Sequence, residues 1–173
     1  MDRNMNARNR IWEELRQAKA NIICLQRYTS KARKKSRIFN IIIIVCASAG
    51  ALGGIYEQWI AIVASALIAI SSVLKALLAN FIQSEHELSE LDRLTDFYSK
   101  YLNSLEKIWY ENENKISTEK EIMSNFFQLK EDECDKYSSM NKGVRSIPDK
   151  EMRAINAQAK EYVSRVYFNY DKN

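Results

Sequence analysis

The fold of this chain is decided by residues 38–82, which read IFNIIIIVCASAGALGGIY (38–56), EQ (57–58) and WIAIVASALIAISSVLKALLANFI (59–82). The first apolar stretch has 19 residues and no charged side chain. At about 1.5 Å per residue, a helix of this length spans roughly 28 Å, close to the hydrocarbon thickness of a bilayer. The second stretch has 24 residues and a single charge, Lys75. The two stretches together predict a transmembrane helical hairpin.

The alternative is a helical hairpin buried inside a soluble bundle. A helix at the surface of a soluble bundle normally keeps one polar face. The first stretch offers only Asn40, Cys46 and Ser48 around its circumference. This composition favours the membrane hypothesis over the soluble one.

The rest of the chain is polar and poor in residues that break helices. The mean hydropathy is −0.39, so the apolar residues of the 173-residue chain are concentrated in a few segments. One Pro and four Gly in the whole chain argue for long helices and against sheets, which need turns. We therefore expect an all-α membrane protein, in which long cytoplasmic helices on both sides of the hairpin form a helical bundle.

Charge is distributed unevenly along the chain. Residues 1–37 hold 11 Lys and Arg against 3 Asp and Glu, whereas residues 83–173 hold 14 against 18. The basic excess is densest directly before the first stretch, at Lys31, Arg33, Lys34, Lys35 and Arg37. Cationic residues that flank a span stay on the cytoplasmic side. Both termini are therefore predicted to be cytoplasmic, with the chain a multi-pass membrane protein and the lipid bilayer its first partner.

The same basic cluster has a second interpretation, which is nucleic-acid binding. The edge of a membrane already accounts for five cations at this position, because each can gain about 1 kcal/mol from anionic lipid. We therefore expect no direct nucleic-acid partner.

Residues suited to catalysis or metal binding are scarce. Cys24, Cys46 and Cys134 lie far apart, and His86 is the one histidine, so no metal-binding spacing is present. We find no nucleophile paired with a base and no Gly-rich phosphate loop. The sequence predicts a protein that is not an enzyme, with no catalytic residue, metal or cofactor.

Residues 8–35 are predicted to form an amphipathic helix. Its apolar side chains step by four and three residues, which is the spacing of a helical seam: Ile11, Leu15, Ala18, Ile22 and Leu25. A seam needs a partner, and the chain after residue 88 repeats the pattern at Leu91, Thr95, Tyr98, Leu102, Leu105, Trp109, Asn112 and Ile116. Because no Pro or Gly intervenes, we expect one helix to continue from the second stretch into this region.

Two breaks follow. The apolar pattern shifts phase after ENENKISTEKE (111–121), at Ile122, Phe126 and Leu129, which predicts a turn near residues 112–118. Residues 141–148 form a polar linker in which Ser146 can cap and Pro148 can open a last helix over about 148–170. The apolar face of that helix is expected at Met152, Ile155, Ala159, Tyr162 or Val163, Val166 and Tyr170.

These elements divide the chain into four segments. They are an N-terminal cytoplasmic amphipathic helix (1–37), the transmembrane hairpin (38–82), a long cytoplasmic helical region (83–140), and a linker with the C-terminal helix (141–173).

Small residues recur at every fourth position of both apolar stretches, at Gly50 and Gly54 and at Ala61, Ser65 and Ala69. Small residues let helix backbones approach closely in lipid. We expect Gly50, Gly54, Ala61 and Ala69 to pack helices together. The contact joins either the two helices of one hairpin or neighbouring copies of the chain.

Lys75 is the one charge inside an apolar stretch, and two hypotheses account for it. A lysine near the end of a span can extend its amine to the headgroups. Alternatively Lys75 faces an aqueous pore, with Ser65 and Ser72 as further lining residues, although serine in a membrane helix also bonds its own backbone. Ser65, Ser72 and Lys75 are therefore candidate pore residues.

This layout resembles the SLATT family, the two-transmembrane effector domains of bacterial nucleotide-signalling defence systems. The resemblance rests on the basic approach YTSKARKKSR (28–37), the tight hairpin, a helix carrying Phe97, Tyr98, Tyr101, Leu102 and Leu105, and a late Ile147-Pro148 before the last helix. It covers roughly residues 12–167. It implies an anti-phage effector that disrupts the inner membrane, with nucleotide-synthesising enzymes or reverse transcriptases as partner proteins of the defence operon.

Three functional hypotheses follow. The first is an effector that assembles as a homo-oligomer and forms a pore or disrupts the membrane, which arrests or kills the cell. The second is a membrane-anchored helical scaffold that recruits a cytoplasmic partner. The third is a soluble helical protein that inserts into the membrane only on activation, which the uninterrupted apolar stretches disfavour.

Overall fold

The computed structural model describes residues 2–56, 84–144 and 146–168, together with residues 62, 65, 66, 69, 70 and 73. Of residues 2–6, 46, 47, 49–56 and 168 it describes the backbone alone. The described residues form four long helices and no strand: α1 (Asp2–Tyr56), α3 (Glu85–Glu113), α4 (Glu119–Gly143) and α5 (Asp149–Phe168). The prediction of an all-α fold is confirmed.

The chain divides into two compact units. One comprises Met1–Tyr28 and Glu90–Asn173, and the other comprises Thr29–Ser89. The helix α1 contributes to both, because it runs without a break from Asp2 to Tyr56. The division into segments 1–37, 38–82, 83–140 and 141–173 stays a prediction.

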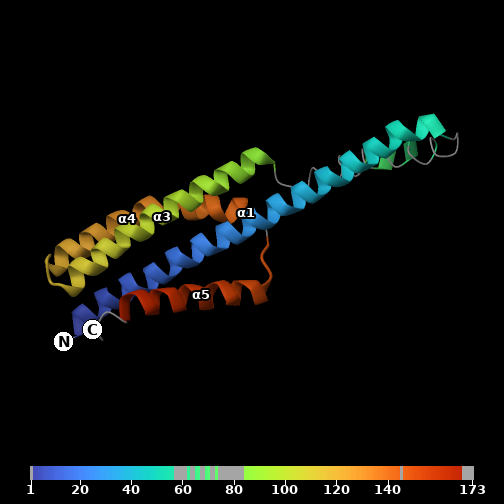
Figure 1. Cartoon of the computed structure of the whole chain (residues 1–173). Helices are drawn as coiled ribbons and strands as arrows, with labels where there is room; N and C mark the ends of the chain where they lie inside the picture. Colours follow the sequence, from blue (N-terminus) through green and yellow to red (C-terminus); the bar gives the residue numbers. More distant parts are fainter. Residues whose placement is uncertain are drawn as a thin grey trace. The chain divides into compact units, whose positions relative to one another are not determined.

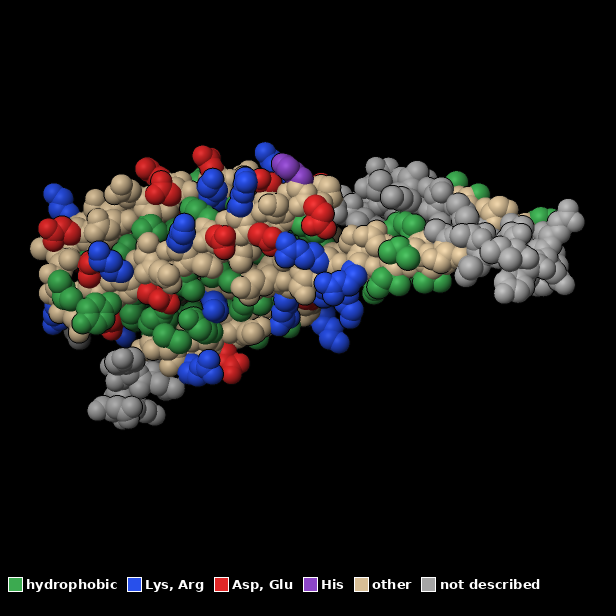
Figure 2. All heavy atoms as spheres, turned by 45° about the horizontal axis from the view of Figure 1, so that its top comes forward, with side chains coloured by type: hydrophobic (Ala, Val, Ile, Leu, Met, Phe, Trp, Pro, Cys, Tyr) green, Lys and Arg blue, Asp and Glu red, His purple; other side chains and the backbone are tan. Residues whose placement is uncertain are grey.

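The first unit is a helical bundle in which chain direction alternates. The first half of α1 and the whole of α4 run in one direction, and α3 and α5 run in the opposite direction (Figure 1). Residues 114–118 connect α3 to α4, and residues 144–148 connect α4 to α5. Gly143, the last residue of α4, lies against α3: a Cβ added there would be 2.8 Å from Cδ2 of Leu91. The absence of a side chain thus permits α4 to end close to α3. Lys, Arg, Asp and Glu side chains are spread over the outer face of the bundle (Figure 2).

The predicted seam of α1 is confirmed. Its five apolar residues are all buried, at 0 to 5% exposure: Ile11, Leu15, Ala18, Ile22 and Leu25. They belong to one core cluster with the predicted α3 residues Leu91, Tyr98, Leu102, Leu105 and Trp109 and the α4 residues Ile122 and Phe126. Thr95 and Asn112 are only half-buried. The prediction is wrong for Ile116, which is 61% exposed because α3 ends three residues earlier, at Glu113.

The predicted turn near residues 112–118 is confirmed, and its capping explains it. Lys115 has a φ of 54°, a left-handed conformation that stops a helix. Thr118 then caps α4 in a capping box, because its side chain accepts from the amide of Glu121 while the Glu121 carboxylate accepts from the amide of Thr118. Two backbone donors at the start of α4 are satisfied in this way.

A capping box also begins α3, and its position corrects a prediction. The amide of Ser84 donates to Oε2 of Glu87 at 2.7 Å, and the amide of Glu87 donates to Oγ of Ser84 at 3.2 Å. Ser84 itself is not helical. The expectation that one helix continues unbroken from the second apolar stretch into α3 is therefore wrong at Ser84, because serine and glutamate three residues apart supply a helix start without Pro or Gly.

The last helix matches its prediction closely. The carbonyl of Pro148 accepts from the amides of Glu151 and Met152, so the helix opens at Pro148, as expected, and its first helical residue is Asp149. Ile155, Ala159 and Val163 are fully buried, Tyr162 and Val166 are half-buried, and Met152 is 38% exposed. Val163, the alternative to Tyr162, is thus the inward residue. Tyr170 lies outside the described residues.

The first helix is longer than predicted. The expectation of a helix over residues 8–35 is wrong in its bounds, because α1 extends to Tyr56. The first 49 residues contain neither Gly nor Pro, so nothing in the basic segment ends the helix. Like charges three or four residues apart oppose a helix by only a few tenths of a kcal/mol per pair.

No helix formed by the described residues is both long and apolar enough to cross a membrane. The predicted second span, residues 59–82, lies outside those residues except at the six positions given above.

Replacing a core side chain should test the bundle. Leu105→Ala is expected to lower the free energy of unfolding by about 2–5 kcal/mol, because the fully buried side chain leaves a cavity. Lys100→Ala, at an exposed position of the same helix, should change it by less than about 0.5 kcal/mol. Urea unfolding of the purified chain in a mild detergent, followed by circular dichroism, measures both. Equal losses would contradict this core.

Candidate functional site

The predicted basic cluster lies on the part of α1 that belongs to the second unit. All five of its side chains are exposed: Lys31, Arg33, Lys34, Lys35 and Arg37. At about 100° per residue, these positions cover an arc of about 200° and leave about 160° of the helix circumference without a cation. Exposed cations directly before an apolar stretch suit the headgroup region of a membrane surface.

The apolar residues that follow are exposed as well. Ile38, Ile41, Ile42, Ile44 and Val45 are 50 to 63% exposed on the helical backbone of α1. Ile62, Ile70 and Val73, from the second stretch, are 56 to 66% exposed. Large aliphatic side chains with this exposure form a surface that water does not favour.

The candidate pore and packing residues are described only in part. Ser65 and Ala69 are helical and exposed, and Oγ of Ser65 donates to the carbonyl of Ile62 at 3.0 Å. Gly50 and Gly54 lie in the helical backbone of α1. Ala61, Ser72 and Lys75 lie outside the described residues. The described residues bring none of these candidates together, so the roles assigned to them stay predictions.

A polar network that the sequence did not indicate lies inside the bundle. The amine of Lys130 on α4 donates to Oε1 of Glu14 at 2.8 Å and to Oε2 of Glu133 at 3.4 Å. The hydroxyl of Tyr101 donates to the same Oε1 of Glu14 at 2.9 Å, and the hydroxyl of Tyr98 donates to Oε1 of Glu133 at 2.9 Å. Five side chains from α1, α3 and α4 thus form one connected set, which we call the Lys130 network.

Both carboxylates of this network are removed from water. The side chains of Glu14 and Glu133 are 11% and 7% exposed, whereas that of Lys130 is 40% exposed. A buried carboxylate is costly unless it is paired and hydrogen-bonded, and here one amine and two hydroxyls supply the partners.

The network also keeps the protons on its two phenols and its amine. Burial raises the pKa of Tyr98 and Tyr101, and the carboxylates of Glu133 and Glu14 raise it further, so both phenols remain neutral donors. Burial lowers the pKa of Lys130, but its hydrogen bonds with Glu14 and Glu133 outweigh that effect and leave the pKa raised. Lys130 therefore remains a cation between the two carboxylates.

The sequence carried little signal for this network. Tyr98 lies on the predicted apolar seam of α3, but a tyrosine there is equally suited to plain packing. Glu14, Lys130 and Glu133 sit one position away from apolar residues, as charged residues at the solvent edge of any amphipathic helix do. Which of them turns inward depends on how the three helices pack.

The described part of the chain contains no candidate metal site. Its residues contain no group of three or more His, Cys, Asp or Glu that could hold a metal ion. Cys24 is buried and free, and Cys134 is exposed and free. Burial raises the pKa of the Cys24 thiol, which makes it less reactive.

No protein-family model, curated protein or solved structure matches this chain. The resemblance to the SLATT family therefore stays a prediction from layout and residue pattern.

The protonated network should make the bundle sensitive to alkali. The pKa values of Tyr98, Tyr101 and Lys130 are raised in the folded chain, so their stabilisation is complete below about pH 10 and is lost as pH rises beyond it. Each group contributes at most about 1.4 kcal/mol per pH unit, less where water screens it. Thermal melting from pH 8 to 11.5 should show a falling Tm above pH 10.

Tyr101→Phe provides the comparison, because it removes one titrating group from the network. Its Tm should be lower at pH 8 and should fall less steeply above pH 10. A parallel decline in both chains would contradict the assignment to Tyr101.

Proposed function

We propose that this chain is a non-enzymatic effector of the bacterial inner membrane, which assembles as a homo-oligomer and permeabilises or disrupts the bilayer. The proposal deepens what the two apolar stretches indicate and what the resemblance to SLATT effectors implies. In a defence setting, permeabilisation arrests or kills an infected cell. The activating partner is expected to be a nucleotide-signalling protein or a reverse transcriptase.

The observation that carries the proposal is the exposed aliphatic surface of α1. Ile38, Ile41, Ile42, Ile44 and Val45 cover an arc of about 160° at 100° per residue. A water-facing arc of a soluble helix is normally polar. The same arc contacting lipid tails is favourable, so its exposure supports a segment that meets a bilayer or another copy of the chain.

The basic cluster supports the same placement. Lys31, Arg33, Lys34, Lys35 and Arg37 end directly where the aliphatic surface begins, which is where anionic headgroups meet the hydrocarbon core. The segment between the two stretches carries a single charge, Glu57. This asymmetry supports an arrangement in which both termini, and with them the bundle, are cytoplasmic.

A pore requires several copies of the chain, because the two helices of one copy are too few to form it. Two transmembrane helices cannot enclose a water-filled path, because their own packing fills the space between them, so a pore needs several copies. The small residues at fourth positions, among them Gly50, Gly54 and Ala69, supply surfaces on which helices associate in lipid.

The bundle is the part suited to control this assembly. Its α1 segment is fastened to α4 through Glu14 and Lys130, and α1 continues into the apolar unit. A change in how α1 packs in the bundle is a change in a helix that both units share. We propose that activation acts through this helix.

Inducible expression in bacteria with a membrane-potential dye tests the proposal. The wild-type chain, co-expressed with its activator where one is needed, should depolarise the cells. Gly50→Leu and Ser65→Leu should abolish depolarisation, because a bulky side chain keeps the helices apart. Ile70→Leu, a change of equal volume at an exposed position, should leave it intact.

Each variant must still enter the membrane fraction and resist extraction with alkaline carbonate. Release of the wild-type chain by carbonate would contradict integral insertion. Unchanged depolarisation by Gly50→Leu and Ser65→Leu would contradict an assembled pore.

Exchanging the hairpin separates the effector from the scaffold hypothesis. Residues 38–82 are replaced by an unrelated two-span anchor of equal length, which keeps the bundle and its tethering. An effector should lose its toxicity to the cell completely, because the path through the bilayer is gone, whereas a scaffold should keep its activity. Colony counts after induction measure the difference, and full toxicity of the exchanged chain would favour the scaffold.

A further inference from the structure

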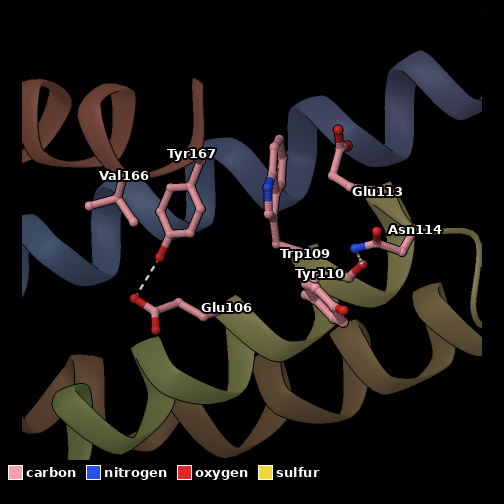
Figure 3. Close-up of a pocket in the computed structure, with 7 residues that line it drawn as sticks. All are labelled: Glu106, Trp109, Tyr110, Glu113, Asn114, Val166 and Tyr167. Atoms are coloured by element: carbon pink, nitrogen blue, oxygen red, sulfur yellow. Dashed lines mark hydrogen bonds between the residues drawn. The ribbon is translucent and has the colours of Figure 1, made fainter. Parts of the chain in front are cut away.

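A cavity with a volume of about 630 Å³ lies between the ends of α3 and α5 in the bundle (Figure 3). Its wall is built by Glu106, Trp109, Tyr110, Glu113, Asn114, Val166 and Tyr167. The volume falls within the range of small-molecule sites, roughly 300–1,000 Å³. We call it the α3–α5 cavity.

Three aromatic residues are among the described residues that line the cavity: Trp109, Tyr110 and Tyr167. Trp109 and Tyr167 approach each other from α3 and α5 with ring centroids 5.9 Å apart (Figure 3). Tyr110 is 61% exposed, so its ring is accessible at the edge of the cavity. Aromatic faces attract cations, ammonium and guanidinium groups above all.

Two contacts between a cation and an aromatic ring already occur in the bundle near this cavity. The guanidinium of Arg8 lies 5.3 Å from the ring centroid of Trp109, and the amine of Lys19 lies 3.7 Å from that of Tyr162. These pairs show that ring surfaces of α3 and α5 at this end of the bundle accept organic cations as neighbours.

The charged side chains of the cavity wall also favour a cationic ligand. Among the described residues that line the cavity, Glu106 and Glu113 are charged and none is Lys or Arg. Arg8 neutralises Glu113 through two hydrogen bonds, of 2.8 and 3.1 Å. Glu106 accepts a hydrogen bond from the neutral hydroxyl of Tyr167 at 2.5 Å and takes part in no ion pair with any described residue. Lys19 interacts electrostatically with Glu106, but no Lys or Arg of the described residues forms an ion pair with it.

The wall does not suit a metal ion or an anion. A hard divalent cation takes six or more oxygen ligands, and no group of acidic residues able to hold a metal is found in the described part of the chain. An anion would face Glu106 across an aromatic surface. The remaining class is an organic cation that combines positive charge with apolar methyl or methylene groups.

We propose that the α3–α5 cavity binds a small organic cation, with an ammonium or guanidinium group held by Glu106 and the rings of Tyr110 and Tyr167. Such a ligand contacts α3 and α5 together and lies beside the Arg8–Glu113 pair, which joins α1 to α3. The proposal is independent of the membrane function, because it concerns the bundle alone.

Isothermal titration calorimetry of the purified chain with choline tests it. The neutral isostere 3,3-dimethylbutan-1-ol, which has the same shape without the charge, should bind at least about tenfold more weakly. Equal affinity of the two probes, or no heat with choline up to millimolar concentration, would overturn the proposal. Ethylguanidine in a parallel titration distinguishes a preference for guanidinium from one for ammonium.

Two variants locate the site. Glu106→Gln keeps an oxygen that can accept from Tyr167 but removes the charge, and it should weaken choline binding about tenfold. Tyr110→Ala removes an exposed ring and should weaken binding similarly, with circular dichroism unchanged. Glu111→Gln makes the same charge change on α3 outside this cavity and should bind choline as the wild type does. Equal effects of Glu106→Gln and Glu111→Gln would show a nonspecific charge effect and overturn the assignment.

Discussion

The amine of Lys130 lies between two buried carboxylates, and the packing of the bundle depends on this arrangement. An apolar seam by itself tolerates a helix that slides by one turn, about 5.4 Å, because leucine then meets leucine or isoleucine again. The Lys130 network does not tolerate it, since Glu14 and Glu133 would each lose donors and remain buried as unpaired charges. Polar groups of this kind add little net stability compared with apolar side chains of equal volume. What they supply is a single relative position for α1, α3 and α4, and this position fixes where α1 leaves the bundle.

That constraint matters because α1 belongs to two units with different surfaces. Up to Tyr28 it contributes to a core that is covered by charged helices, and beyond Arg37 it presents isoleucine and valine outward. The same regular backbone carries both, since the basic segment between them contains neither Gly nor Pro. The pairing of Arg8 with Glu113 and of Lys130 with Glu14 therefore holds one end of a helix whose other end lies in the apolar unit. In the proposed effector, α1 is one covalent connection through which a change in the bundle reaches the apolar unit.

Periodic and local features of the structure could be predicted from the sequence, and features that depend on packing could not. The seam from Ile11 to Leu25 repeats every three or four residues, so it follows from helix geometry alone. The turn before Thr118 and the helix opened by Pro148 have chemical signals within a few residues. A helix does not run unbroken through Ser84, because Ser84 and Glu87 form a capping pair whose three-residue spacing is visible in the sequence. The Lys130 network and the α3–α5 cavity join residues up to 116 positions apart, so no local pattern indicates them.

The apolar stretches carry small and polar residues that hydrophobicity alone does not require. An anchor needs only length and hydrophobicity, and leucine satisfies both. This chain instead places Gly50, Gly54, Ala61, Ser65 and Ala69 at intervals of four, where small side chains reduce contact with lipid tails and allow helices to approach. Ser65 adds a hydroxyl that bonds the carbonyl of Ile62, which satisfies its donor within the helix and so lets a small polar residue occupy an apolar segment at little cost. Close packing of the two helices within one hairpin would use these small residues, and so would the proposed assembly of copies in the bilayer.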